Sequence, residues 1–498
     1  TEPRARHAAM SAPVFDNTYA RLPEGFFAPA PPAVPPEPEL IRVNSKLASA
    51  LGLDEEWLRS AQGLAMLSGA KLPEGAEPIA MAYAGHQFGG WVPQLGDGRA
   101  TLLGEVVGDD GVRYDVQLKG SGRTRFSRRG DGKAVLGPVL REYVVSEAMH
   151  AYGVPTTRAL AAVTTGEEVF RNGPEPGAVL TRVAQSHVRV GTFQYFAGRG
   201  DDEAVKTLAD YVLDRHYLSA RDADHVYRAL FESILARQAE LIAHWMSLGF
   251  IHGVMNTDNM QVVGETIDYG PCAFMDDFHP QKRFSSIDHH GRYAWGNQPG
   301  IAMWNLSRLA ETLIPLLGED EKAAVSWAEA AIPAFRDIFG GALKRRFRAK
   351  LGLVGEADGH DALVEATFAA LTEGEVDFTL FFRRLTSLVG GEREEPLRDL
   401  FTERRVADTW LARWRQQVKA EGGDDAARLE AMKRANPVFI PRNHRIEEAI
   451  QAGNAGDYAP FHRLVDVLKR PFDEQPDHAD LEQAPEPHEV VTQTFCGT

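Results

Sequence analysis

The pattern of apolar residues changes near residue 200, and this change limits the folds that the chain can adopt. Before it, "RATLLGEVVG" and "VRYDVQLKG" are apolar, rich in β-branched residues and separated by the turn "DDG", which predicts a β-hairpin. After it, apolar residues recur at helical spacing over 225–249, and the segments 301–352, 361–388 and 396–420 are also amphipathic. We therefore expect an α+β protein with a β-rich lobe up to about residue 200 and a helical lobe after it.

Within the β-rich part, one helix and one further strand-like stretch are expected. In "GPVLREYVVSEAMHAYG", Pro138 stands near the helix start, apolar residues share one face and Gly153 ends the run. A second β-like stretch covers 178–191. The proline-rich residues 23–39 predict an extended arm, because proline disfavours helix at its own position and at the preceding residue.

Composition excludes several classes of protein. The chain has 498 residues, of which 44% are hydrophobic and 25% charged, so wholesale disorder is excluded. Its net charge of −16 argues against nucleic acid as a partner, because binding it requires Lys and Arg to neutralise phosphates. No run approaches the roughly 20 apolar residues of a membrane span, and the N-terminus lacks an apolar signal-peptide core. We expect a soluble protein that is not secreted and has no membrane partner.

Two features before residue 145 could hold a phosphate. In "QLGDGRA", Gly96 and Gly98 would let backbone N–H groups approach an anion and Arg99 adds positive charge, although "GDG" is also a plain hairpin turn. Lys119 ends an apolar strand, where an ammonium group is costly unless it is paired or touches phosphate. Glu142 follows on the predicted helix. A strand lysine and a helix glutamate in this order form the ion pair with which kinases position nucleotide phosphates, although each alone is more often a surface charge.

The stretch "HGVMNTDNMQVVGETIDYGPC" contains the parts of a kinase catalytic loop and metal loop in altered positions. A protein kinase has an Asp two residues after the His, and here that residue is Val254. Asn259 and Asp268 could bind Mg²⁺, which needs few protein oxygens when phosphate and water supply the others. Asp258 is then available to accept a proton from a hydroxyl. The alternative is an Asx-rich turn without chemistry.

The positive charge suggests which phosphate is attacked. Arg182 and Arg189 stand on the β-like "TRVAQSHVRV" and, with Lys119 and Arg99, give more positive charge than a departing terminal phosphate usually meets. If these residues hold the γ-phosphate in place, attack moves to the α-phosphate and the product is an AMP adduct. Spacing alone does not separate this reaction from ordinary phosphoryl transfer by a kinase-like fold, or from a nucleotide-binding redox sensor without catalysis.

The two cysteines, Cys272 and Cys496, exclude a disulfide scaffold and a Cys-rich zinc site. They could be two free thiols or form a reversible bridge. The consecutive Asp288, His289 and His290 could in principle offer metal ligands, although an exposed turn is the commoner explanation.

Four blocks together resemble the selenoprotein O family of protein adenylyltransferases: "YAGHQFGGWVPQLGDGRATLLGE", "DVQLKGSGRTRFSRRGDGKAVLGPVLREY", "HGVMNTDN" and "DYGPCAFMD". The resemblance runs from about residue 12 to the C-terminus. It implies a kinase-like, or pseudokinase, bilobal fold that binds ATP in a flipped orientation and transfers AMP to Ser, Thr or Tyr hydroxyls of protein substrates.

The resemblance also implies roles for individual residues. Asp258 would accept the proton, Asn259 and Asp268 would bind Mg²⁺ or Mn²⁺, and Glu142 would hold Lys119. Cys496 occupies the place of the family's selenocysteine, third from the end, so any redox role would be thiol-based, with a regulatory disulfide to Cys272. The nucleotide would be contacted by Gly96, Gly98, Arg99, Lys119, Asp131, Gly132, Arg182, Arg189 and Asp268.

The organisation that we expect is an N-terminal extension with the proline-rich arm (1–80), a kinase-like N-lobe (81–200), a kinase-like C-lobe with the catalytic and metal loops (201–310), and a helical C-terminal extension with an irregular tail (311–498). Family members resembling this chain are bacterial. We expect a cytoplasmic monomer.

Overall fold

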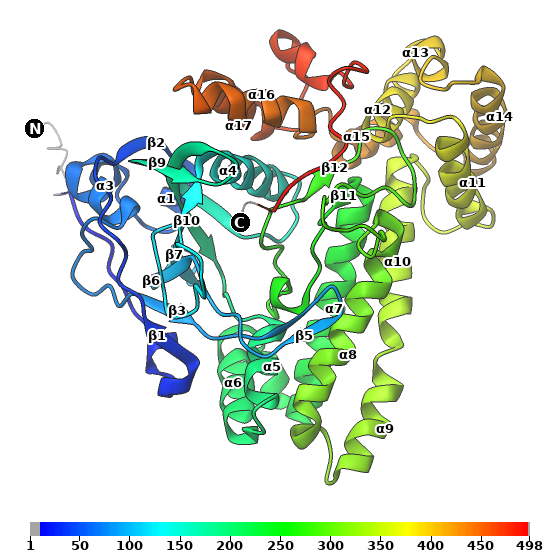
Figure 1. The fold of residues 1–498 in the computed structure, drawn as a ribbon. Helices are drawn as coiled ribbons and strands as arrows, with labels where there is room; N and C mark the ends of the chain where they lie inside the picture. Colours follow the sequence, from blue (N-terminus) through cyan, green and yellow to red (C-terminus); the bar gives the residue numbers. More distant parts are fainter. Residues whose placement is uncertain (1–9, 497–498) are drawn as a thin grey trace, which may run out of the picture.

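The computed structural model describes residues 10–496, with a β-rich half followed by a helical half (Figure 1). The β-rich half is built on an eight-stranded sheet in the order β1-β3-β6-β7-β10-β9-β2, with β8 beside β10 and every pairing antiparallel. The predicted hairpin is confirmed as β6 and β7. The strands are β1 (Phe27–Pro29), β2 (Glu39–Val43), β3 (Ile79–Met81), β6 (Ala100–Val107), β7 (Arg113–Lys119), β8 (Ala134–Val135), β9 (Arg158–Phe170) and β10 (Pro174–Ala184).

The two faces of this sheet are covered by different helices. Alternate residues of a strand point to opposite faces, and Val116 and Leu118 of β7 are buried against one face with residues of the short helices α1 (Ser45–Ala50), α2 (Glu55–Arg59) and α3 (Ala61–Ser68). The predicted helix is confirmed as α4 (Leu136–Ala151), which packs on β9 and β10 at the other face (Figure 1). Residues that alternate with Leu118 therefore face α4.

The strand-like stretch 178–191 is only partly a strand. β10 ends at Ala184, and Arg189 is the residue before α5 (Val190–Ala197). Arg189 forms only an isolated antiparallel bridge with Gln261, so the two arginines do not share one strand. The chain leaves the sheet because the Asp115 carboxylate accepts hydrogen bonds from the backbone N–H of His187 at 3.0 Å and from its ring Nδ1 at 2.9 Å. This turn carries Arg189 away from the sheet.

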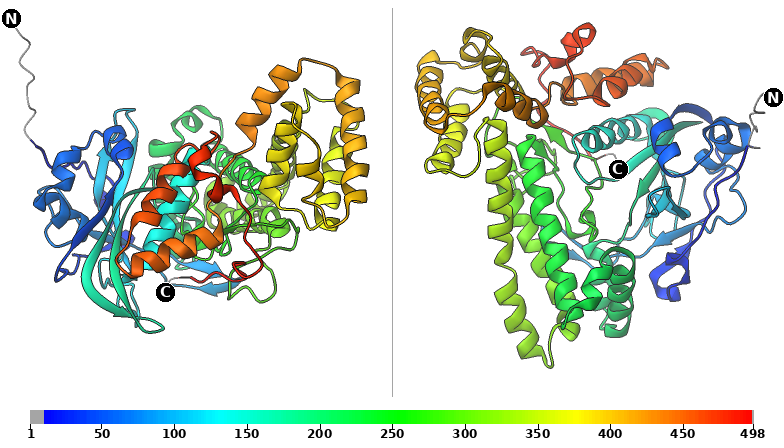
Figure 2. Two further views of the ribbon diagram at one scale, coloured as in Figure 1. Left: turned by 90° about the horizontal axis from the view of Figure 1, so that it is seen from above. Right: turned by 180° about the vertical axis from the view of Figure 1, so that it is seen from behind.

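Long helices form the second half, as predicted. α7 (Val226–Ser247), α8 (Gln298–Leu317) and α10 (Ala334–Lys350) lie side by side (Figure 1). α16 (Asn443–Asn454) and α17 (Ala459–Leu468) pack instead on α4 of the β-rich half (Figure 2). The remaining helices are α6 (Asp202–His216), α9 (Glu321–Ala331), α11 (His360–Glu373), α12 (Phe378–Val389), α13 (Glu395–Arg398), α14 (Arg404–Glu421) and α15 (Asp425–Ala435).

Two small ribbons position the loops that the sequence analysis singled out. β11 (Phe250–Ile251) pairs with β12 (Ala273–Phe274). The segment from His252 to Cys272 is therefore a loop whose two ends are held together by this pairing. β4 (Gly85–Gln87) pairs with β5 (Gly90–Val92) to form a separate hairpin.

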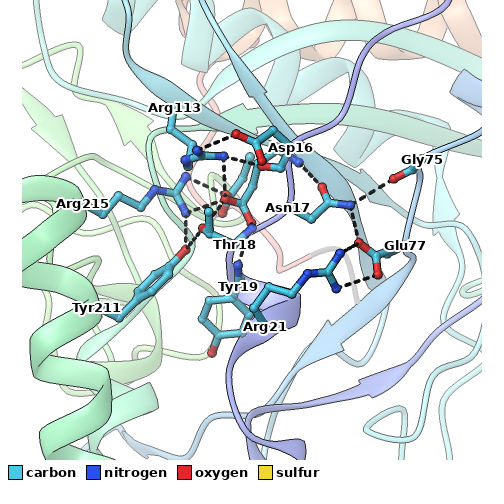
Figure 3. Close-up of polar contacts among 12 residues, drawn as sticks. Asp16, Asn17, Thr18, Tyr19, Arg21, Gly75, Glu77, Arg113, Tyr211 and Arg215 are labelled. Carbon is cyan, nitrogen blue, oxygen red and sulfur yellow. Dashed lines mark hydrogen bonds and ion pairs between the residues drawn. The ribbon is translucent and has the colours of Figure 1, made fainter.

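The N-terminal segment is tied to both halves of the molecule (Figure 3). The backbone N–H groups of Thr18 and Tyr19 donate to Glu105 of β6 at 2.9 and 2.8 Å. The Thr18 hydroxyl lies 2.8 Å from the hydroxyl of Tyr211 on α6. Because β1 and β2 also belong to the main sheet, part of the expected N-terminal extension is built into it.

Within residues 10–496, none of the helices combines the length and the apolar character required to cross a lipid bilayer.

Candidate active site

A cavity of about 1380 Å³ brings the sequence-predicted site residues together. It lies between the sheet, α4 and the loop from His252 to Cys272. Of the residues to which the family resemblance assigns a role, Cys272 alone does not line it. Those that do are Gly96, Gly98, Arg99, Lys119, Asp131, Gly132, Glu142, Arg182, Arg189, Asp258, Asn259, Asp268 and Cys496.

Strand alternation gives this cavity one polar wall. Gln117 and Lys119 alternate with Leu118 and so face α4, and Arg182 of β10 is the direct partner of Gln117 in the ladder. Arg182 donates from Nε and Nη2 to Gln117 Oε1 at 3.0 and 2.7 Å. Lys119 Nζ lies 2.6 Å from Glu142 Oε2, so the strand lysine and the helix glutamate do pair. Arg182 Nη1 lies 3.1 Å from the other oxygen of Glu142.

Three cationic side chains surround the Asp268 carboxylate. Its carboxylate lies 2.5 Å from Arg189 Nη1, 2.8 Å from Arg182 Nη1 and 3.6 Å from Lys119 Nζ. Burial would raise the pKa of this carboxyl, but the three cations hold it well below its usual range. Asp268 also has a left-handed backbone, with φ of 62°, which is uncommon outside glycine and aims its side chain at the arginines. The result is an ionised carboxylate within a strongly positive wall.

Asp258 lies on the other side of the cavity, in a single turn of 3-10 helix (Thr257–Asn259). Its Oδ2 accepts a hydrogen bond from Gln87 Nε2 at 3.2 Å, whereas its buried Oδ1 has no hydrogen-bond partner. Burial raises the pKa of Asp258 to about 6, although the positive charge of Arg189 opposes this. The carboxylate is therefore mainly ionised at neutral pH, with one oxygen able to accept a proton.

Asn259 can offer an oxygen to a metal ion. Its Nδ2 donates to the carbonyl oxygen of Val254 at 2.8 Å, which leaves Oδ1 as the atom for ligation. Within residues 10–496 there is no cluster of three or more His, Cys, Asp or Glu side chains that could hold a metal. The run at 288–290 is accordingly a turn: Asp288 accepts hydrogen bonds from the backbone N–H groups of Arg292 and Tyr293 at 2.8 and 2.9 Å.

Three glycines in the cavity wall are required by close packing. A Cβ on Gly96 would lie 2.4 Å from the ring of Phe126, one on Gly98 would lie 2.9 Å from the Phe126 carbonyl oxygen, and one on Gly132 would lie 2.1 Å from the Gly122 carbonyl oxygen. Gly96 and Gly132 also have left-handed backbones, with φ of 81° and 70°. The absence of side chains at Gly96 and Gly98 lets the turn at 96–98 approach the loop at 120–133, and the absence of one at Gly132 lets the two ends of that loop lie together.

Asp131, next to Gly132, forms an ion pair at the edge of the cavity. Its carboxylate receives two hydrogen bonds from Arg171, at 2.9 and 3.0 Å, which lower its pKa to about 2. Asp131 is therefore ionised and held in place at the cavity wall.

The two cysteines have different surroundings. Cys272 is buried, and burial raises the pKa of its thiol to about 11. Cys496 lines the cavity, and its Sγ lies close enough to Gly270 that a Cβ there would be 3.4 Å away. The two thiols are not joined to each other in the structure.

Several residues of the site were not predicted from the sequence. The ring of Tyr83 lies under the Arg189 guanidinium, 4.6 Å from centroid to carbon. Thr257 Oγ1 accepts from the His86 backbone N–H at 2.7 Å and donates to Gln194 Oε1 at 2.6 Å. Gln117 could have been found from its two-residue spacing to Lys119, whereas the others carry no local signal.

Comparison with known proteins gives a consistent assignment. The family model described as protein adenylyltransferase SelO matches residues 10–469. A protein nucleotidyltransferase YdiU of Rhodopseudomonas palustris (strain BisB18) is 58% identical over 485 residues, which cover 97% of this chain and 99% of that protein. Proteins of the same name from Methylorubrum extorquens and Rhizobium etli are also 58% identical, over 492 and 486 residues and 97% of this chain, covering 99% and 97% of the respective relatives. The chain belongs to the SelO family of protein adenylyltransferases.

Proposed function

We propose that this protein transfers AMP from ATP to Ser, Thr or Tyr hydroxyls of protein substrates, with the β-rich and helical halves acting as the two lobes of a kinase-like fold. Asp258 takes the proton as the hydroxyl oxygen forms a bond to the α-phosphorus. The bond between that phosphorus and the bridging oxygen breaks, and pyrophosphate leaves with its electron pair. The products are an AMP–protein ester and pyrophosphate.

The observation that carries this proposal is that the unpartnered Oδ1 of Asp258 belongs to the same cavity as the cationic wall. A base and a cluster of phosphate-binding cations are the two parts that nucleotidyl transfer needs. Lys119, Arg182 and Arg189 would hold the β- and γ-phosphates in place, which favours attack at the α-phosphate. Glu142 fixes Lys119, and the glycine turns allow close approach of the nucleotide.

A magnesium ion fits this arrangement, with Mn²⁺ as the alternative. Mg²⁺ binds through one or two protein oxygens together with phosphates and water, and Asp268 and Asn259 line the cavity with such oxygens. When bound, the ion would neutralise phosphate charge. The cations that now surround Asp268 would then contact phosphate oxygens.

One experiment separates this reaction from the two alternatives. The protein is incubated with a mixed protein substrate and with ATP labelled either at the α- or at the γ-phosphate. We expect label on protein only from the α-labelled ATP. Label only from γ-labelled ATP would identify a kinase, and no label from either would favour a nucleotide-binding sensor.

We also propose that Cys272 and Cys496 form a reversible regulatory disulfide. The position of Cys496 against Gly270, two residues before Cys272, supports it. A bridge would fix the C-terminal residues at the wall of the nucleotide cavity. The cytoplasmic location and the monomeric state expected from the sequence stay predictions.

A further inference from the structure

A second hollow, of about 800 Å³, adjoins the active-site cavity. Phe88, at the tip of the β4–β5 hairpin, and Ile287 line both spaces. The outer hollow is completed by the turn at 288–292 and by the start of α8, including Ile301. Its volume is in the range of sites that enclose a small molecule, which is room for a few side chains of a bound segment. A molecule in this hollow could therefore extend one side chain past Phe88 and Ile287 into the active-site cavity.

The wall between the two spaces is fixed to the loop that carries Asp258. The backbone N–H of Phe88 donates to Asn256 Oδ1 at 3.0 Å, and the hydroxyl of Tyr293 donates to the same oxygen at 2.7 Å. The rings of Phe88 and Tyr293 lie 5.0 Å apart. Phe88 has a left-handed backbone, with φ of 50°, a strained conformation for a bulky residue that these contacts maintain. The wall between the outer hollow and the cavity that contains Asp258 is thus held in place by the loop that carries Asp258.

The outer hollow carries a positive charge without a counter-ion. The Arg292 guanidinium lies against the rings of Tyr293 and Trp304, with centroid distances of 5.7 and 5.0 Å. No carboxylate of residues 10–496 forms an ion pair with it, and its buried Nε has no hydrogen-bond partner. The neighbouring Asp288 is already satisfied by backbone N–H groups. The chain has a net charge of −16, yet the Arg292 guanidinium has no carboxylate partner among the described residues. It is therefore available to bind an anionic group of another molecule.

We propose that this hollow binds the acceptor segment of the protein substrate, and that the segment is acidic. An acidic side chain of the substrate would pair with Arg292, and an apolar one would lie against Ile287, which is 48% exposed. The acceptor hydroxyl would then pass Phe88 toward Asp258. The inference rests on the proposed function, because it assumes that a protein hydroxyl is the acceptor.

The test uses the full-length protein with ATP and Mg²⁺ and two short fluorescent peptides. Both contain a central serine and a leucine, and one carries glutamates where the other carries lysines. Fluorescence anisotropy measures their binding to the wild type, to Arg292→Ala and to Arg292→Lys. The matched control is Arg308→Ala, because Arg308 lies over the same Trp304 ring at 5.0 Å but pairs with Glu311 at 2.8 Å and does not line the hollow.

We expect the wild type to prefer the acidic peptide. Arg292→Ala should weaken its binding by about tenfold, since a hydrogen-bonded charge is lost, and Arg292→Lys should restore part of the affinity. Arg308→Ala should bind as the wild type does. Equal affinity of the wild type for the two peptides, or equal losses in Arg292→Ala and Arg308→Ala, would overturn the proposal.

Transfer of α-label to a mixed protein substrate and release of pyrophosphate, measured with the same variants in the absence of the peptides, report on the proposed function separately. A wild type that labels no protein and releases no pyrophosphate contradicts the proposed function, while the peptide affinities still decide whether the hollow binds acidic segments.

Discussion

At the scale of single residues, the chemistry depends on one carboxylate with one unpartnered oxygen. Asp258→Ala removes the proposed base but none of the cations of the phosphate-binding wall. We expect AMP transfer to fall by about 10²–10⁴-fold, with ATP affinity changed only a few-fold. Quantifying α-label on protein and ATP binding by calorimetry checks this. Transfer at the wild-type rate would show that Asp258 is not the base.

Gly85 determines where that carboxylate lies. A Cβ at this position would be 2.5 Å from Asp258 Oδ1 and 2.9 Å from its Cβ. Gly85→Ala should therefore displace Asp258 and lower the transfer rate by at least about tenfold, because small misplacements of catalytic groups are costly. ATP affinity should be unchanged. Gly340→Ala on α10, where a Cβ meets nothing within 4 Å, is the control and should behave as the wild type.

At the scale of elements, the β4–β5 hairpin acts as a clamp on the catalytic loop. Thr257 joins them, because its buried hydroxyl bonds both the His86 backbone and Gln194 on α5. Thr257→Val keeps the shape of the side chain but leaves the buried Gln194 oxygen and the half-buried His86 N–H without their partner, which costs roughly 2–4 kcal/mol of unfolding free energy. We expect a loss of AMP transfer beyond this loss of stability, since the loop that carries Asp258 is loosened.

The matched control for this clamp is Thr367→Val. Thr367 is equally buried, donates to the Leu363 carbonyl oxygen at 2.7 Å and accepts from Trp410 Nε1 at 2.9 Å, far from the cavity. Denaturant unfolding and transfer assays on both variants separate stability from positioning. If Thr257→Val and Thr367→Val lose the same stability and retain the same AMP-transfer activity, the β4–β5 hairpin does not position the loop that carries Asp258.

The C-terminal segment is a second element that reaches the site. Thr494 pairs with Phe284 and Ser286 through its backbone and donates from its hydroxyl to the Pro271 carbonyl oxygen at 2.6 Å, which delivers Cys496 to the cavity. Cys496→Ser should abolish any change of activity on treatment with an oxidant, because the proposed bridge then cannot form. Transfer assays before and after diamide or peroxide check this, and unchanged oxidant sensitivity would contradict the bridge.

At the scale of the whole molecule, a buried polar seam joins the two halves. It includes Glu105, which binds the N-terminal segment, and Asp115, which lies 2.8 Å from Arg215 of α6. Glu265 belongs to the same region, where its Oε1 accepts from the Gln185 backbone N–H at 2.8 Å. Burial raises the pKa of Glu265 to about 8, although this hydrogen bond opposes the shift.

Because Glu265 titrates in this region, the free energy of unfolding should depend on pH. Between the ordinary glutamate pKa and about 8, the folded state binds one proton more than the unfolded state, so Glu265 lowers stability as the pH rises. Glu265→Gln removes this pH dependence and keeps the accepting oxygen. We expect the variant to gain stability over the wild type with rising pH, by roughly 3 kcal/mol at pH 7. Urea unfolding at several pH values measures it, with the exposed Glu319→Gln as control; a gain that is independent of pH would refute the assignment.

Local sequence patterns predicted much of the secondary structure. The β6–β7 hairpin, α4 and the long helices follow from periodicity, turn residues and helix boundaries, and alternation along β7 already places Lys119 on the α4 side. The same reasoning missed β9, and it extended the strand β10 into the turn that Asp115 imposes on His187. A side chain from another strand causes that turn, so no local pattern records it.

The sequence by itself determined the family, the strand Lys119, the helix Glu142 and the order of Asp258, Asn259 and Asp268, because these are properties of spacing and residue type. Only the tertiary structure decided which oxygen of Asp258 is unpartnered and which positions must be glycine. It also decided that Arg292 lies at the outer hollow without an ion pair to any carboxylate of residues 10–496. Gln87 and Asp258 are 171 residues apart, and Arg182 and Asp268 are 86 apart. Contacts over such distances depend on how the two halves pack, and this packing is set by the summed burial of the whole chain rather than by any short stretch of it.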